Sequence, residues 1–102
     1  MHYTLSTDWG KTWGETRPLP FYGNCAYLHR APDNTILIGY REYLPETKEY
    51  HTALRYSRDE CKTWSPAVRV DDVLGGQPSL VNLEGDSMLI VYYEEGVGSN
   101  IR

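Results

Sequence analysis

Apolar and aromatic residues occur along this chain in short runs, and each run ends at a cluster of turn-forming residues. Runs of four to eight residues rich in Val, Ile, Thr and Tyr are typical of β-strands, whereas an amphipathic helix needs a longer stripe with a period near 3.6. Residues 32–34 (Pro-Asp-Asn) and 84–86 (Glu-Gly-Asp) have the composition of tight turns between strands. The pattern predicts an all-β fold, with strands at residues 2–5, 15–19, 26–28, 35–40, 52–56, 65–70, 79–81 and 88–93.

The chain repeats itself with a period of about fifty residues. The segment at residues 6–13 recurs at residues 57–64 with the same Ser, Asp, Lys, Thr and Trp. A second similarity relates residues 25–42 to residues 78–95, where an apolar run, a turn and a longer apolar strand follow one another. Two hairpin types therefore alternate, and one of each makes four strands, which is the content of one propeller blade of forty to fifty residues.

The order of these hairpins predicts how blades are distributed along the chain. If the strands of a blade are called A to D and the repeated segment joins C to D, the order is C, D, A, B, C, D, A, B. Residues 99–102 then begin another C strand. We expect one domain over residues 1–102, built from four-stranded antiparallel blades, with about two blades per chain and only the middle one complete.

The repeated segment has a recognisable form, Ser-x-Asp-x-Gly-x-Thr-Trp. Its first copy matches at Ser6, Asp8, Gly10, Thr12 and Trp13. The second copy matches at Ser57, Asp59, Thr63 and Trp64, with Cys61 in place of the glycine. The segment resembles the Asp box, and the chain is similar to the Asp-box, or BNR-repeat, superfamily of sialidase-like β-propellers. That resemblance implies a propeller fold.

The residue types of the motif favour a structural role over a catalytic one. The Asp can accept hydrogen bonds from the backbone N–H groups of its own turn, and the Trp can pack its large face between neighbouring strands. We expect Gly10 to supply a positive φ, which Cys61 reaches only with strain. Asp8 and Asp59 are therefore not expected to form an acid/base pair.

Composition excludes several classes of partner. The net charge is −4 and no two Lys or Arg are adjacent, so neither nucleic acid nor an anionic membrane is expected to bind. The two cysteines, Cys25 and Cys61, are far apart in the sequence, so we expect free, partly buried thiols. Three scattered histidines give no metal-ligand spacing, and neither a metal nor a cofactor is expected. No signal peptide or apolar span of membrane length is evident, so a cytoplasmic location is expected if the chain is complete as written.

The resemblance implies that sugar-binding groups lie at the end of the sheet opposite the Asp boxes. In this sequence the candidates there are Arg41, Glu42, Gln77, Asn24 and Phe21. Arg41 could hold a sugar carboxylate through two parallel hydrogen bonds. The alternative is an ordinary ion pair of Arg41 with Glu42 or Glu94.

The catalytic candidates are Tyr92 or Tyr93 beside Glu94 and Glu95, and Tyr93 and Glu94 are chosen from them. They resemble the tyrosine nucleophile and carboxylate partner that sialidase-like enzymes use. The alternative is a strand tyrosine that merely packs. A sialidase-like site also needs several arginines drawn from most of six blades, and two blades cannot supply them.

Three functions remain open from the sequence. The first is a glycan-recognising sialidase-like module that is not an efficient enzyme by itself. The second is a sialidase-type exo-glycosidase whose site is assembled across subunits or missing blades, and the third is a structural scaffold fragment with no sugar ligand. The expected partners are missing propeller blades or the chain itself, because a homotrimer of two-bladed copies would complete a six-bladed ring.

Overall fold

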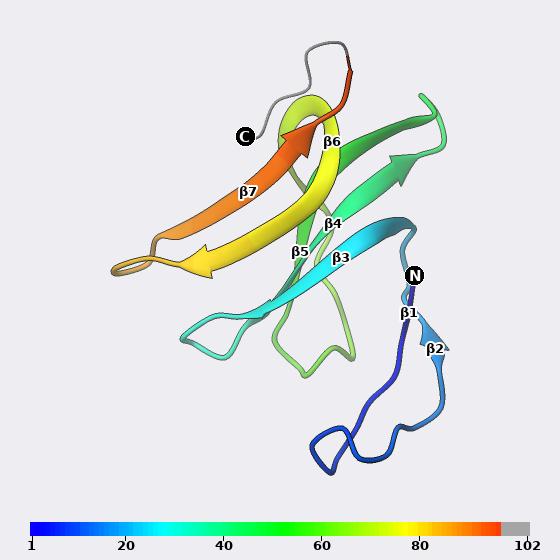
Figure 1. The fold of residues 1–102 in the computed structure, drawn as a ribbon, viewed down its shortest axis with the longest axis vertical. Helices are drawn as coiled ribbons and strands as arrows, with labels where there is room; N and C mark the ends of the chain where they lie inside the picture. The colour runs from blue at the N-terminus through cyan, green and yellow to red at the C-terminus, as the bar shows by residue number, and fades with distance from the viewer. Residues whose placement is uncertain (97–102) are drawn as a thin grey trace.

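The computed structural model describes residues 1–96, which form seven antiparallel strands (Figure 1). The strands are β1 (His2–Tyr3), β2 (Arg17–Pro18), β3 (Gly23–Arg30), β4 (Ile36–Leu44), β5 (Glu49–Ser57), β6 (Val68–Asn82) and β7 (Met88–Glu94). Strands β1 and β2 form a small hairpin sheet, and β3 to β7 form a curled sheet in the order β3-β4-β5-β6-β7. The all-β prediction is confirmed.

Strand β6 connects two parts of the curled sheet. Its first part pairs with β5, from Leu54–Val68 to His51–Leu74, and its last part pairs with β7, from Gly75–Glu94 to Asn82–Met88. Irregularities interrupt both ladders, and the strand bends sharply between them (Figure 1). The bend turns the β6–β7 hairpin over the β3–β4 pair instead of leaving it as a flat extension of the sheet.

Strand β4 is packed on both of its faces. On one face, Ile38 and Tyr40 join Phe21 and Ala53 in the buried core, and the N-terminal segment packs there through Met1 and Leu19. On the other face, a Cβ added to Gly39 would lie 2.7 Å from Leu80 Cδ1 and 3.0 Å from Pro78 Cγ. The absence of a side chain at residue 39 therefore lets β6 approach closely.

The eight expected strands correspond to seven observed ones. The runs at 65–70 and 79–81 are expected as separate strands, but the second half of the first run and all of the second lie in the continuous, bent strand β6. The first two strands are also shorter than expected, with two residues each. The expected strand at residues 99–102 lies outside the described residues.

The two tryptophans of the repeated segment have different environments. Trp64 is half-buried and packs edge-on against Phe21, with ring centroids 5.8 Å apart. Trp13 is 64% exposed. The expectation that the motif Trp packs between strands is therefore met by Trp64 and not by Trp13, since within the described residues no second strand pair covers the β1–β2 hairpin on that side.

We predict unequal effects from removing these two rings. Trp64→Ala should lower the free energy of unfolding by about 3 kcal/mol, because it opens a cavity beside Phe21. Trp13→Ala, the matched control, should change it by no more than about 0.5 kcal/mol, as is usual for surface positions. Urea denaturation of both variants measures this. Equal losses, or no loss for Trp64→Ala, would contradict the packing described.

Candidate functional site

Arg41 lies in β4, where the middle of β6 and the end of β7 approach it through Gly76 and Glu95. Its aliphatic part lies beneath Gly76, where an added Cβ would be 2.7 Å from Arg41 Cδ. Its guanidinium carbon is 4.1 Å from the centre of the Tyr50 ring, a cation–π contact. The side chain is only 18% exposed, so its position is fixed on two sides.

A carboxylate occupies the accessible side of this guanidinium. Arg41 Nη2 donates to Glu95 Oε2, while Tyr93 Oη donates to Glu95 Oε1 at 2.6 Å. The backbone N–H of Glu95 in turn donates to the Leu74 carbonyl oxygen at 2.7 Å. Arg41 Nε is buried and has no hydrogen-bond partner among residues 1–96. We call Arg41, Tyr50, Tyr93 and Glu95 the arginine cluster.

The hydrogen bonds of the arginine cluster set its protonation states. The hydroxyl of Tyr93 and the positive charge of Arg41 both lower the pKa of Glu95, against the effect of burial. The same hydrogen bond to Glu95, with some burial, raises the pKa of Tyr93. Glu95 is therefore an anion and Tyr93 a neutral phenol at neutral pH.

The partner of Arg41 differs from both alternatives considered from the sequence. It is Glu95, not Glu42 or Glu94. Alternation along a strand could have indicated this, since Tyr93 and Glu95 are two residues apart and share a side, whereas Glu94 faces away. Tyr50 was also missed, because its contact with Arg41 depends on the register of β4 and β5.

Two candidate ligand residues belong to the opposite face of β4. Glu42 accepts hydrogen bonds from Tyr40 Oη at 2.9 Å and from Arg55 Nη2 at 3.4 Å. Phe21 is 8% exposed and packs on Tyr40, with Arg55 over its ring. Phe21 is therefore part of the core, where Tyr40 and Arg55 contact its ring, and Glu42 belongs to an internal hydrogen-bond network.

Three further candidates lie near the arginine cluster without a defined role in it. Asn24 is exposed and pairs with Arg41 across β3 and β4. Gln77 is exposed at the irregularity in β6, with a φ of 50°. Glu94 is half-buried at the end of β7 and pairs with Gly75.

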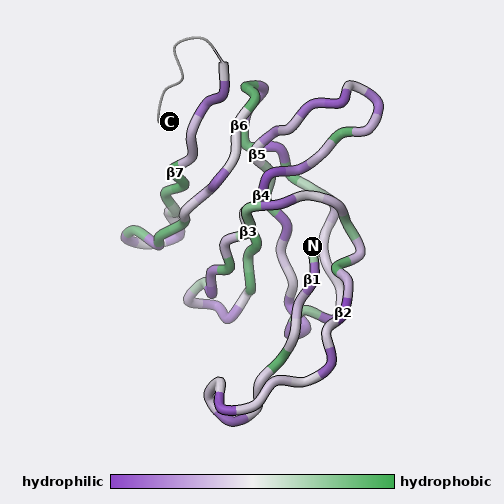
Figure 2. The backbone as a smooth tube through the Cα atoms, turned by 45° about the vertical axis from the view of Figure 1, so that its right-hand side comes forward, coloured by the Kyte–Doolittle hydropathy of each residue, from purple (hydrophilic) through white to green (hydrophobic). Residues whose placement is uncertain are grey.

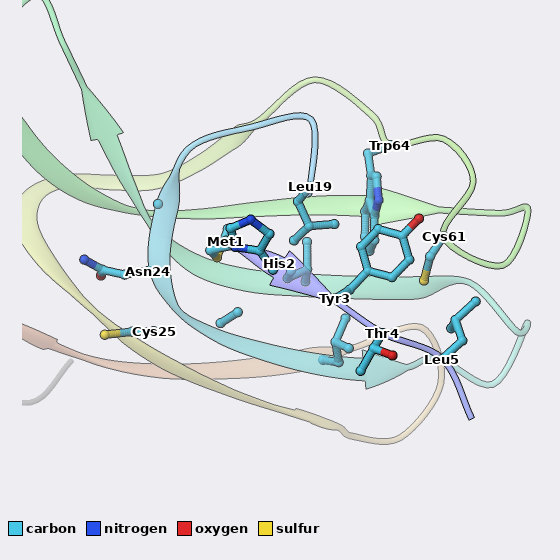
Figure 3. Close-up of a pocket in the computed structure, with 14 residues that line it drawn as sticks. Met1, His2, Tyr3, Thr4, Leu5, Leu19, Asn24, Cys25, Cys61 and Trp64 are labelled. Atoms are coloured by element: carbon cyan, nitrogen blue, oxygen red, sulfur yellow. The ribbon is translucent and has the colours of Figure 1, made fainter. Parts of the chain in front are cut away.

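An apolar pocket lies elsewhere, between the N-terminal strand and β3 (Figure 3). Its volume is about 560 Å³, and its wall includes Leu5, Leu28 and Ile38. Asn24 and Cys25 lie at one end, and Cys61 and Trp64 at the other (Figure 3). Both thiols are free, but Cys25 is exposed, so the expected partial burial holds only for Cys61. We call this pocket the N-terminal groove.

The two repeated segments form the same turn at the other end of the sheet. In the first, Asp8 Oδ1 accepts from the Thr12 N–H at 2.9 Å and Oδ2 accepts from Thr12 Oγ1 at 2.6 Å. Ser6 Oγ accepts from the Gly10 N–H at 2.8 Å. In the second, Asp59, Thr63 and Ser57 make the corresponding hydrogen bonds, with Cys61 as the donor to Ser57.

The backbone of these turns explains the glycine position. Gly10 has a φ of 81° and Cys61 a φ of 66°, and the residues before them, Trp9 and Glu60, are also positive. The expected positive φ is confirmed at both sites. Cys61 therefore adopts a conformation that costs a non-glycine residue energy, and the turn's hydrogen bonds offset that cost.

The same hydrogen bonds lower the pKa of both aspartates. Bonds from Thr12 and Ser6 lower the pKa of Asp8 from 3.8 to about 2, and bonds from Thr63 and Ser57 do the same for Asp59. A carboxylate held ionised by its own turn is a poor general acid at neutral pH. The hydrogen bonds of each aspartate stay within its own turn, so the turns act in local structure.

Among residues 1–96, no group of three or more His, Cys, Asp or Glu side chains is placed to bind a metal ion. The same residues contain no helix long and apolar enough to cross a membrane.

Comparison of the chain with models of known protein families, with curated proteins and with solved structures finds no match. The all-β architecture therefore rests on the structure itself.

We predict that both aspartates make stability depend on acid pH. A group whose pKa is lower in the folded state than in the unfolded chain stabilises the fold above its unfolded value. This stabilisation should be present above about pH 4 and decline as the pH falls towards 2. In thermal melting, the parent should have a higher melting temperature than Asp59→Asn at pH 6, and this difference in melting temperature should narrow by about pH 2.

Asp86→Asn is the control, because Asp86 lies exposed in the β6–β7 turn. Its melting temperature should follow the parent at each pH. A difference between the parent and Asp59→Asn that stays constant with pH would show that the carboxylate charge is not what stabilises the turn.

Proposed function

We propose that the chain is a glycan-recognising module of the sialidase-like, Asp-box kind, built from propeller blades, and that it is not an efficient enzyme by itself. The support for the family is the two turns, which share one hydrogen-bond set, and the antiparallel strands that follow them. The support for the function is at the other end of the sheet. There Arg41, whose side chain is fixed by its neighbours, already binds the carboxylate of Glu95.

The ligand class follows from the arginine cluster. Arg41 is stacked on Tyr50 and covered by Gly76, so little side-chain entropy is lost when its guanidinium binds. Its planar donors suit a carboxylate, and the Tyr93 hydroxyl adds another donor to the same anion. An acidic sugar, with a carboxylate for Arg41 and hydroxyls for neighbouring polar groups, fits this chemistry.

Glu95 limits the affinity of such a site. Its carboxylate uses the donors that a ligand carboxylate would need. A ligand must displace it, and the exchange of one carboxylate for another yields little net free energy. We therefore expect weak binding by one copy of the chain, with Glu95 acting as an internal competitor.

Efficient glycoside hydrolysis is less well supported. A tyrosine bonded to a carboxylate is the pair that a tyrosine nucleophile uses, and Tyr93 and Glu95 are such a pair. However, a nucleophilic tyrosine needs a lowered pKa, and the pKa of Tyr93 is raised. A single arginine also supplies fewer contacts to the substrate than a full site would.

Titration with a sialoside and with the matching neutral glycan tests the proposal. We expect the parent to bind the acidic glycan more tightly than the neutral one. Arg41→Ala should weaken acidic-glycan binding about 10- to 100-fold, the range for losing charged hydrogen bonds. Glu95→Gln should strengthen it, because the neutral amide competes less well for Arg41.

Arg17→Ala is the matched control, since Arg17 is an exposed arginine on β2. The affinity of Arg17→Ala for the acidic glycan should equal that of the parent. Turnover of a fluorogenic sialoside should stay at background for the parent and for every variant. Equal binding of the acidic and neutral glycans, or an unchanged affinity in Arg41→Ala, would contradict recognition through Arg41.

A further inference from the structure

The outward face of the β6–β7 hairpin is apolar and uncovered. Leu80 points towards Gly39 and is 4% exposed. Because side chains alternate along a strand, its neighbours in the hairpin point outward. Val81, Leu89 and Val91 are those outward residues, and they are between 39% and 49% exposed. Hydrophobic colour runs along β7 in Figure 2. We call these three residues the hairpin face.

The N-terminal groove is a second apolar surface, on the opposite side of the β3–β4 pair. Leu28 pairs with Ile38 across these strands, and it is 60% exposed at the wall of the groove. The groove continues the packing already made by Met1 and Leu19 on the same face. No Asp, Glu, Lys or Arg side chain of the described residues lines it, so covering it would desolvate no side-chain charge of that kind.

The chain contains a template for how a hairpin covers β3 and β4. On the far face of these strands, β6 already packs Leu80 and Pro78 onto Gly39, and Asn82 Oδ1 lies 2.9 Å from His29 Nε2. The near face has only the short β1–β2 hairpin. A β6–β7 hairpin from another chain would supply there the strand pair that the far face receives from within the chain.

The amount of exposed surface fits a missing partner. The chain exposes 7188 Å², whereas a compact monomer of 11.7 kDa exposes about 5,900 Å². The excess, about 1,300 Å², lies within the range that specific protein interfaces bury in total. The radius of gyration is 14.6 Å, against about 12.8 Å for a compact chain of this length.

We propose that a second copy of this chain docks head to tail, with the hairpin face of one copy covering the N-terminal groove of the next. The two surfaces belong to different parts of the chain. The contact is therefore heterologous, and repeating it closes a ring if the rotation fits, as three copies would do in a six-bladed assembly.

Sedimentation equilibrium of the 102-residue chain is the first test. The parent should have a concentration-dependent mass that rises above 11.7 kDa towards three times that value. Leu28→Glu places a charge in the groove and Val91→Glu places one on the hairpin face. Each should weaken association by at least about tenfold, because the charge would be buried without a partner.

Val68→Glu is the control, because Val68 is 55% exposed at the start of β6, outside both surfaces. It should associate like the parent. Circular dichroism of all the variants should match the parent, because each substituted side chain is exposed in a single copy.

Mixing the two blocked variants tests the head-to-tail direction. A Val91→Glu copy keeps its groove and a Leu28→Glu copy keeps its hairpin face, so the mixture should form a dimer that cannot extend. A parent that stays monomeric at every concentration would overturn the proposal. So would an assembly that neither variant weakens, or a mixture that stays monomeric while the parent associates.

Discussion

The packing of β4 between two hairpins is the interaction on which the rest of the structure depends. Alternate residues of this strand have opposite requirements: Ile38 and Tyr40 fill an aromatic core with Phe21, while Gly39 must have no side chain so that Leu80 and Pro78 can approach. One strand thus positions both the N-terminal segment and the β6–β7 hairpin. Arg41 follows two residues after Gly39 on the same face, so the close approach of β6 at Gly39 also brings Gly76 over Arg41 and Glu95 within reach of it.

The two ends of the sheet have separate roles. At one end, Asp8 and Asp59 satisfy the backbone donors of their turns, which ties successive strands together locally. At the other end, long-range contacts between β4, β6 and β7 assemble the arginine cluster. The proposed recognition of acidic sugars depends on the second end only, whereas the stability of the fold depends on both ends. Head-to-tail docking would leave the Arg41 end open, because it uses the outward face of the hairpin and the groove beside β3.

Local features of the fold were predictable from the sequence, and long-range ones were not. Short apolar runs and turn residues located the strands, and the Ser-x-Asp pattern predicted turns whose positive φ occurs at both Gly10 and Cys61. The pattern did not reveal that two runs merge in the bent strand β6, because no strong turn signal is needed for a strand to bend at irregular pairing. Phe21, a candidate ligand residue from the sequence, is buried in the core, because an aromatic residue in a loop gives the same sequence pattern whether it faces solvent or core. The choice of Glu95 over Glu94 depended on the side from which β7 meets β4.

Native-state amide hydrogen exchange followed by NMR tests the central role of β4 most directly. If β4 is packed on both faces, the amides of residues 36–41 and of their partners in β5 should exchange most slowly, near the rate set by global unfolding. The amides of β1 and β2 should exchange much faster, because that hairpin has two residues per strand and a largely exposed turn. Rapid exchange throughout β4, with protection confined to β6 and β7, would contradict the account.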